Sequence, residues 1–62
     1  MFVYGMKLRG FDLGNQPMAG LVEHRPDPTG KYWDIVCYTY MLSGEEMRQY
    51  DLAYIGEERA DA

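Results

Sequence analysis

A run rich in aromatic and β-branched residues at positions 31–41 limits the possible folds of this chain more than any other segment. The run reads Lys-Tyr-Trp-Asp-Ile-Val-Cys-Tyr-Thr-Tyr-Met, and side chains of these types favour extended backbone. Apolar residues occupy both alternating faces of the run, which is typical of a strand inside a sheet. We therefore expect residues 31–41 to form the central strand of a small sheet.

A helix start is predicted directly after this run. The Ser43 hydroxyl is placed to accept a hydrogen bond from the backbone N–H of Glu46, while the Glu46 carboxylate accepts one from the backbone N–H of Ser43. Leu42 and Met47 occupy the two positions whose side chains pack together around such a cap. The sequence therefore predicts that a helix begins at residue 44.

The predicted helix covers residues 44–55 and ends at Gly56, which can adopt a left-handed conformation. Its apolar side chains at helical spacing are expected to pack on one face of the sheet. These side chains are Met47, Tyr50 and Tyr54. Asp51 interrupts this face, so we expect its carboxylate to pair with a cation. The candidate cations are Lys7, Arg9 and Arg48.

Two shorter segments are predicted to complete the sheet. Residues 2–9 alternate in polarity, with one set of side chains expected in the core. That set is Phe2, Tyr4, Met6 and Leu8. Residues 21–25 precede the turn-forming sequence Pro-Asp-Pro-Thr-Gly at 26–30, so we expect them to form a hairpin with the central strand. Residues 10–20 between the first two strands form a glycine-rich loop.

The expected fold is α+β, in the order βββα, with a three-stranded, mainly antiparallel sheet and one C-terminal helix packed on one face. The third strand is expected to be central, in the order 1-3-2. Residues 1–56 form this one domain and residues 57–62 a flexible acidic tail, because polar chain ends are seldom held in place. A chain of 62 residues has no room for a second core, since even one core buries only about 60% of the unfolded surface.

Composition argues against several catalytic and stabilising devices. Cys37 is the only cysteine and His24 the only histidine, so the chain has no internal disulfide and no Cys/His set for a metal. A thiol buried in an apolar strand reacts poorly, and no third group is placed to orient His24 as a base. We therefore predict no enzyme activity, no cofactor and no metal. The sequence has no signal-peptide pattern and no membrane-spanning stretch, and its single thiol suggests the cytoplasm.

The net charge of −4 is distributed unevenly. Residues 1–31 carry four basic and three acidic side chains, whereas residues 32–62 carry two basic and seven acidic ones. Non-specific binding to a phosphate backbone needs clustered lysine and arginine. The charge balance therefore weakens the case for nucleic-acid binding.

The central strand carries more aromatic surface than one helix can cover. One side bears Trp33, Ile35, Cys37 and Met41, and the other bears Tyr32, Val36, Tyr38 and Tyr40. The side that the helix leaves free is covered by the N-terminal segment or the long loop, or it is an interaction surface. We predict a small accessory protein that acts by protein–protein interaction, as a homodimer or with a larger protein partner. The predicted binding residues are Tyr32, Trp33, Tyr38 and Tyr40, with Asn15 and Gln16 from the loop.

Two other functions remain open. In the first, a nucleic-acid-linked regulator, the same aromatic residues stack on bases and cations contact phosphates. Those cations are Lys7, Arg9, Arg25 and Lys31. In the second, the acidic helix and tail inhibit a nucleic-acid-processing enzyme by occupying a basic groove. The acidic residues concerned are Glu45, Glu57, Glu58 and Asp61. No membrane partner is expected.

Four short motifs add a resemblance. They read Leu-Arg-Gly-Phe at 8–11, Gly-Asn-Gln-Pro at 14–17 with Gly20, Thr-Gly-Lys-Tyr-Trp-Asp-Ile-Val at 29–36, and Leu-Ser-Gly-Glu-Glu at 42–46. Over most of residues 4–55 the chain resembles a set of small bacterial proteins of phages and conjugative elements that have no assigned function. The resemblance implies a small accessory protein of a mobile element, and it transfers no catalytic residues.

Overall fold

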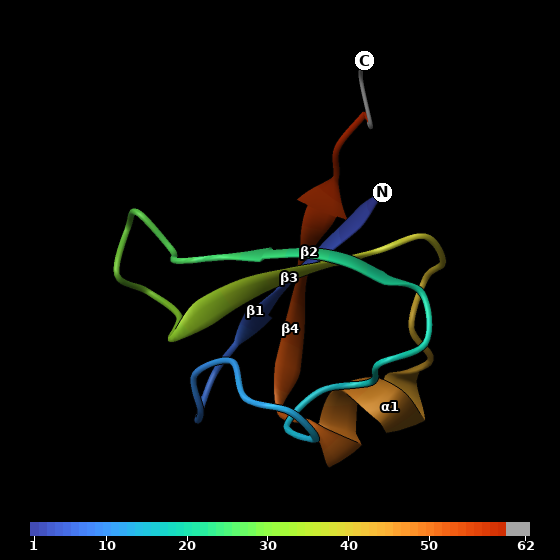
Figure 1. The fold of residues 1–62 in the computed structure, drawn as a ribbon, viewed down its shortest axis with the longest axis horizontal. Helices are drawn as coiled ribbons and strands as arrows, with labels where there is room; N and C mark the ends of the chain where they lie inside the picture. Colours follow the sequence, from blue (N-terminus) through green and yellow to red (C-terminus); the bar gives the residue numbers. More distant parts are fainter. Residues whose placement is uncertain (60–62) are drawn as a thin grey trace.

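The computed structural model describes residues 1–59 and shows four strands and one short helix in this part of the chain (Figure 1). The elements in chain order are β1 (Phe2–Met6), β2 (Leu21–Arg25), β3 (Asp34–Tyr38), α1 (Gly44–Gln49) and β4 (Leu52–Glu57). All neighbouring strands are antiparallel, in the order β2-β3-β1-β4. The α+β class, the antiparallel sheet and the adjacency of the first, third and second strands are confirmed. The sheet has four strands rather than the predicted three.

α1 begins as the sequence predicts. Ser43 Oγ accepts a hydrogen bond from the backbone N–H of Glu46 at 3.1 Å, and Glu46 Oε1 accepts one from the backbone N–H of Ser43 at 3.0 Å. Leu42 is buried, and Met47 packs against the same apolar cluster. These contacts join residues that are close in sequence, which is why the pattern predicts them correctly.

α1 ends at Gln49 instead of residue 55. Asp51 then adopts a left-handed conformation with φ 55°, and its carbonyl accepts a hydrogen bond from the backbone N–H of Lys7 at 3.0 Å. The left-handed turn predicted at Gly56 is therefore made by Asp51. Within residues 1–59 the Asp51 carboxylate forms no ion pair with the predicted cations.

The segment after Asp51 forms β4 because strand pairing outweighs its helical spacing. β4 pairs with β1, with Leu52 opposite Met6 and Glu57 opposite Phe2. This pairing buries Leu52, which is 2% exposed. An isolated helix of about 12 residues is marginal in water, so the pairing with β1 decides the conformation.

Apolar side chains are buried on both faces of the sheet. The first face, toward α1 and the loop at 10–20, carries the main core. It comprises Tyr4, Met6, Val36, Tyr38, Leu42 and Leu52, with Phe2, Phe11, Leu21, Met47 and Tyr50 packed around it. The second face carries a smaller cluster of Val3, Ile35 and Cys37, against which Met1 and Tyr32 pack. Leu8 lies beyond β1 and is 66% exposed, so its predicted place in the core is wrong.

β3 is shorter at both ends than the predicted strand at 31–41. Before β3 the chain bends, because the Asp27 carboxylate accepts a hydrogen bond from the backbone N–H of Tyr32 at 2.8 Å. The Tyr32 ring consequently lies on the second face, where a Cβ added to Gly5 would collide with it. Tyr32 and Tyr38 therefore lie on opposite faces, although strict alternation would place them on the same one.

Both edge strands contain a β-bulge. Val22 is the extra residue in β2, and Ile55 is the extra residue in β4. A bulge bends and twists an edge strand, which hinders pairing with the edge of another chain. The two edges are therefore poor templates for extending the sheet.

The first residue packs beside the end of β4. The Met1 amino group donates to the Glu58 carbonyl at 2.5 Å, and the Glu58 N–H donates to the Met1 carbonyl at 2.8 Å. β4 includes Glu57, so the first residues of the predicted tail at 57–62 are paired, whereas residues 60–62 lie outside the described part of the chain. In the described part, the helix is too short to cross a membrane.

Candidate binding surfaces

Two of the six predicted binding residues are core residues. Tyr38 is fully buried, and its hydroxyl donates to the Pro17 carbonyl at 2.8 Å. Burial raises the pKa of Tyr38 well above its usual value. Gln16 is 1% exposed, and its amide donates to Met18 Sδ at 3.2 Å. Tyr38 joins the loop at 10–20 to the sheet, and Gln16 makes a contact within the loop. Both side chains are buried, so neither is available to a partner in this conformation.

Two further predicted residues serve local structure. The Tyr40 ring lies against Gly20, where an added Cβ would be 2.6 Å from the ring, and its hydroxyl contacts Glu46 Oε2 at 3.4 Å. Asn15 Oδ1 accepts a hydrogen bond from Arg9 Nη1 at 3.1 Å. Tyr40 is 36% exposed, but its ring packs against Gly20 at the end of the loop.

The remaining predicted pair, Tyr32 and Trp33, lies side by side at the end of a well-organised turn. The Asp27 carboxylate accepts hydrogen bonds from the N–H and hydroxyl of Thr29, at 3.0 and 2.8 Å, in addition to the N–H of Tyr32. The bond from the Thr29 N–H, followed by that from Tyr32, holds the pKa of the Asp27 carboxyl below its usual value. The turn leaves Trp33 67% exposed, beside the packed Tyr32 ring.

Two shallow depressions flank Tyr32. The first, of about 380 Å³, is lined by Lys7, Gly30, Lys31, Tyr32 and Trp33. The second, of about 370 Å³, is lined by Asp27, Thr29, Lys31, Tyr32, Tyr54 and Ile55. Lys31 Nζ lies 5.6 Å from the centre of the Tyr32 ring, within cation–π range. We call the group Lys7, Lys31, Tyr32 and Trp33 the Trp33 surface.

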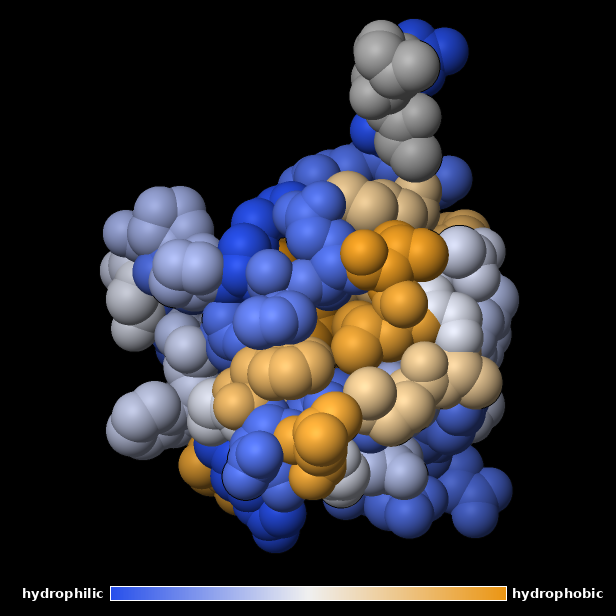
Figure 2. Space-filling view, viewed as in Figure 1, coloured by the Kyte–Doolittle hydropathy of each residue, from blue (hydrophilic) through white to orange (hydrophobic). Residues whose placement is uncertain are grey.

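A second exposed surface lies over β2. Figure 2 shows apolar residues gathered over β2 and the loop that precedes it. The exposed apolar side chains of these segments are Leu13 at 77%, Val22 at 54% and Met18 at 48%, and we call them the β2 surface. No charged residue occurs between Asp12 and Glu23. The sequence analysis does not predict this surface, because the glycines of the loop indicate only turns. The absence of charge over residues 13–22 is the signal that could have indicated it.

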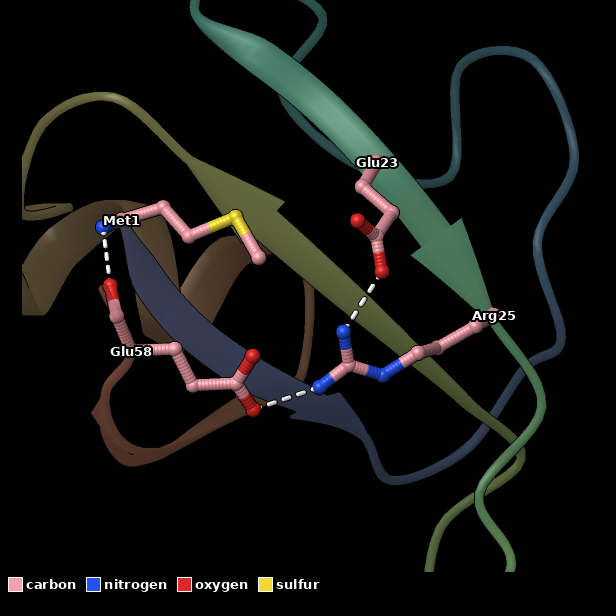
Figure 3. Close-up of polar contacts among 4 residues, drawn as sticks. All are labelled: Met1, Glu23, Arg25 and Glu58. Carbon is pink, nitrogen blue, oxygen red and sulfur yellow. Dashed lines mark hydrogen bonds and ion pairs between the residues drawn. The ribbon is translucent and has the colours of Figure 1, made fainter. Parts of the chain in front are cut away.

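One cation of the predicted phosphate-contacting set is bound to carboxylates. Arg25 extends from β2 across the sheet toward the end of β4 (Figure 3). Its Nη1 lies 2.5 Å from Glu23 Oε2, and its Nη2 lies 2.6 Å from Glu58 Oε2. These two carboxylates raise the pKa of Arg25 above its usual value. Arg25 therefore helps to close the second face and is occupied within the molecule.

His24 and Cys37 do not form a catalytic pair. In the β2–β3 register His24 is opposite Val36 and Cys37 is opposite Glu23, so the two side chains point to opposite faces. His24 stacks on Phe11, with ring centres 3.7 Å apart, and its Nδ1 lies 3.5 Å from Asp34 Oδ2. Cys37 is fully buried, and burial raises the pKa of its thiol. Within residues 1–59, no three acidic, histidine or cysteine side chains gather as a metal site would require.

The fold and its surfaces define a small antiparallel α+β domain with exposed apolar and aromatic groups. Residues 1–57 match the family described as Defence against restriction A C-terminal, and the chain belongs to this family. Neither a curated protein nor a solved structure matches the chain. Membership supports the expected phage or mobile-element association and indicates a role related to defence against restriction, compatible with an accessory protein.

Proposed function

We propose that this domain is a non-enzymatic accessory protein in defence against restriction, and that it acts by protein–protein interaction. Its first partner is a second copy of the chain, docked through the β2 surface. The observation that carries this proposal is the exposure of Leu13, Met18 and Val22 on a segment without charge. Monomeric soluble proteins rarely expose large contiguous apolar patches, and Figure 2 shows apolar residues gathered over β2 and the loop before it.

The charge of the chain favours a second copy at this surface. Two copies, each with a net charge of −4, repel one another wherever acidic groups come together. Residues 13–22 contain no charged side chain, so two copies can meet there without bringing like charges close. A strongly charged partner finds no opposite charge on this segment.

The proposed contact is made by side chains rather than by strand pairing. The bulge at Val22 interrupts the β2 ladder, which makes this edge a poor partner for another strand. A standard interface takes about 800 Å² from each partner, roughly a fifth of the 4161 Å² surface of this chain. Three side chains cover less than that, so we expect a weak dimer that depends on concentration.

Sedimentation velocity tests the proposal at protein concentrations from about 10 µM to about 1 mM, the range of weak interfaces. We expect the weight-average mass to rise toward that of a dimer, and Val22→Glu to keep the chain monomeric. The matched control is Ile55→Glu, because Ile55 is the bulge residue of the other edge strand and is similarly exposed at 48%. A monomeric wild type, or equal effects of the two substitutions, would refute the β2 surface as the interface.

The two alternative functions have less support. A nucleic-acid site across the whole aromatic strand would need Tyr38 and Arg25, which are respectively buried and bound to carboxylates. In the acidic-inhibitor alternative, Glu58 is paired with Arg25, Glu45 lies in the first turn of α1, and Asp61 is outside the described residues. Only the smaller group at the Trp33 surface retains the features of a nucleic-acid site.

A further inference from the structure

The Trp33 surface combines an exposed indole with two cations. Trp33 is 67% exposed and lines a depression of about 380 Å³ together with Lys7 and Lys31. The two lysines come from different parts of the chain, just after β1 and just before β3, and the fold brings them to the same depression. Figure 1 shows how the turn between β2 and β3 extends away from the helix side of the sheet.

The backbone around Trp33 is held in place, although its side chain is free. The Trp33 N–H donates to the Met6 carbonyl at 2.8 Å, and the Tyr32 N–H donates to Asp27 at 2.8 Å. The Tyr32 ring is packed on Gly5 and the small cluster of the second face. A ligand at this surface would not have to order the turn, and the entropic cost of binding is reduced accordingly.

We propose that the Trp33 surface binds single-stranded nucleic acid, with one base stacked on the Trp33 indole and the adjacent phosphates at Lys7 and Lys31. An indole accepts any base because every base has a π-face, and an ammonium group meets phosphate as a point charge. A single strand fits better than a duplex, because a base has to leave its stack to lie on the indole. This site is separate from the β2 surface and does not depend on dimerisation.

The surrounding charges determine the expected strength of binding. Asp27 lines the neighbouring depression, and its carboxylate, which accepts hydrogen bonds from Thr29 and Tyr32, stays negatively charged and opposes a phosphate there. The net charge of −4 opposes a nucleic acid at long range. We therefore expect weak binding that is visible at low salt, with a slope of log affinity against log salt of about −1.4 for two single-strand phosphate contacts.

The single tryptophan makes the test direct, because its emission can come only from Trp33. Titration of oligothymidylate at low salt is expected to quench this emission saturably, and added salt to reverse the quenching. Trp33→Ala is expected to lower the affinity, measured by anisotropy of a labelled oligonucleotide, by about fivefold or more. Lys7→Gln with Lys31→Gln is expected to flatten the salt slope. The single variant Lys31→Gln is compared with Arg48→Gln on α1, which removes the same charge elsewhere and should change neither quantity.

Several outcomes would overturn the proposal. A dissociation constant above about 100 µM at low salt would contradict it, because even non-specific nucleic-acid binding is usually tighter. Equal effects of Lys31→Gln and Arg48→Gln would show that the lysine has no particular place in the site. An acidic peptide or a duplex that quenches Trp33 as well as oligothymidylate would assign the surface to that other class of ligand. Val22→Glu should leave the oligothymidylate titration unchanged. The test of the Trp33 surface is therefore independent of the sedimentation test of the β2 surface.

Discussion

Both faces of the sheet carry buried apolar side chains, but different kinds of structure cover them. The first face is covered by α1 and the loop at 10–20, which bring large side chains from distant parts of the chain to the main core around Tyr4 and Tyr38. The second face is covered by Met1, the Tyr32 ring and the chain of contacts from Glu23 through Arg25 to Glu58. One helix of six residues cannot cover both sides of a four-stranded sheet.

A few individual side chains close the second face of this short chain. The Tyr32 ring on Gly5, the Met1 side chain and Arg25 take the place of a second layer of secondary structure. Surface ion pairs contribute roughly 0 to 1 kcal/mol each, and Arg25 is 35% exposed, so its two pairs add little to stability beyond the cover they provide. We expect the first face to determine global stability and the second face to open locally.

The largest expected effect is on the first face. Tyr38→Ala removes a ring that packs edge-on against Tyr4, with centres 5.9 Å apart, and removes the hydrogen bond to Pro17. Such a truncation costs about 3 to 5 kcal/mol, as much as a core of this size supplies, so we expect the variant to be largely unfolded. The free energy of unfolding is measured by far-UV circular dichroism during urea denaturation.

Tyr38→Phe is the matched control, because it keeps the ring and deletes only the hydroxyl that donates to Pro17. Its expected loss is about 1 kcal/mol. A Tyr38→Ala variant that unfolds at the urea concentration of the wild type would contradict the assignment of the main core to this face.

A smaller effect is expected on the second face. Gly5→Ala places a methyl group where the Tyr32 ring lies, and overpacking of this kind costs about 1 to 3 kcal/mol. We expect the Tyr32 cover to be displaced and the Cys37 thiol, fully buried in the wild type, to react faster with a thiol reagent. The rate of labelling at neutral pH is the measurement.

Two variants separate this clash from a general loss of stability. Gly56→Ala is a control in β4, where an added Cβ meets no atom within 4 Å. Tyr32→Ala in the Gly5→Ala background should restore much of the lost stability, because the two changes act on one contact. If Gly5→Ala leaves the rate of Cys37 labelling unchanged, the Tyr32 ring does not protect the second face from solvent.

The smallest expected effect depends on pH. Hydrogen bonds from Thr29 and Tyr32 lower the pKa of Asp27 in the folded state, so this carboxylate stabilises the fold above its ordinary pKa of about 3.9. That contribution is lost as the pH falls through the lower, folded pKa. Asp27→Asn should therefore be less stable than the wild type at pH 7, and the difference should shrink as the solution is acidified. Urea midpoints that differ equally at pH 7 and at about pH 2 would contradict this linkage.

Most local features could be predicted from the sequence. The capping box at Ser43 and the burial of the centre of β3 were predictable, because each depends on residue types within a few positions. The end of the helix was not, because Leu52 to Ile55 suit a helix or a strand and the choice was made by β1, far away in the chain. The burial or exposure of the predicted binding residues could not be predicted for a similar reason. Asp27 bends the chain before β3, which separates Tyr32 from Tyr38, and the loop at 10–20 buries Tyr38.

Residue types and their spacing are enough to predict a small α+β domain with an antiparallel sheet, a helix that begins after Ser43 and a central apolar strand. Periodicity and capping are short-range, so they can be deduced from neighbouring residues. Two other outcomes come from contacts between distant segments: residues 52–57 form β4, and particular aromatic side chains reach the surface. Those outcomes depend on hydrogen bonds and burial between segments far apart in the chain. No local pattern contains that information.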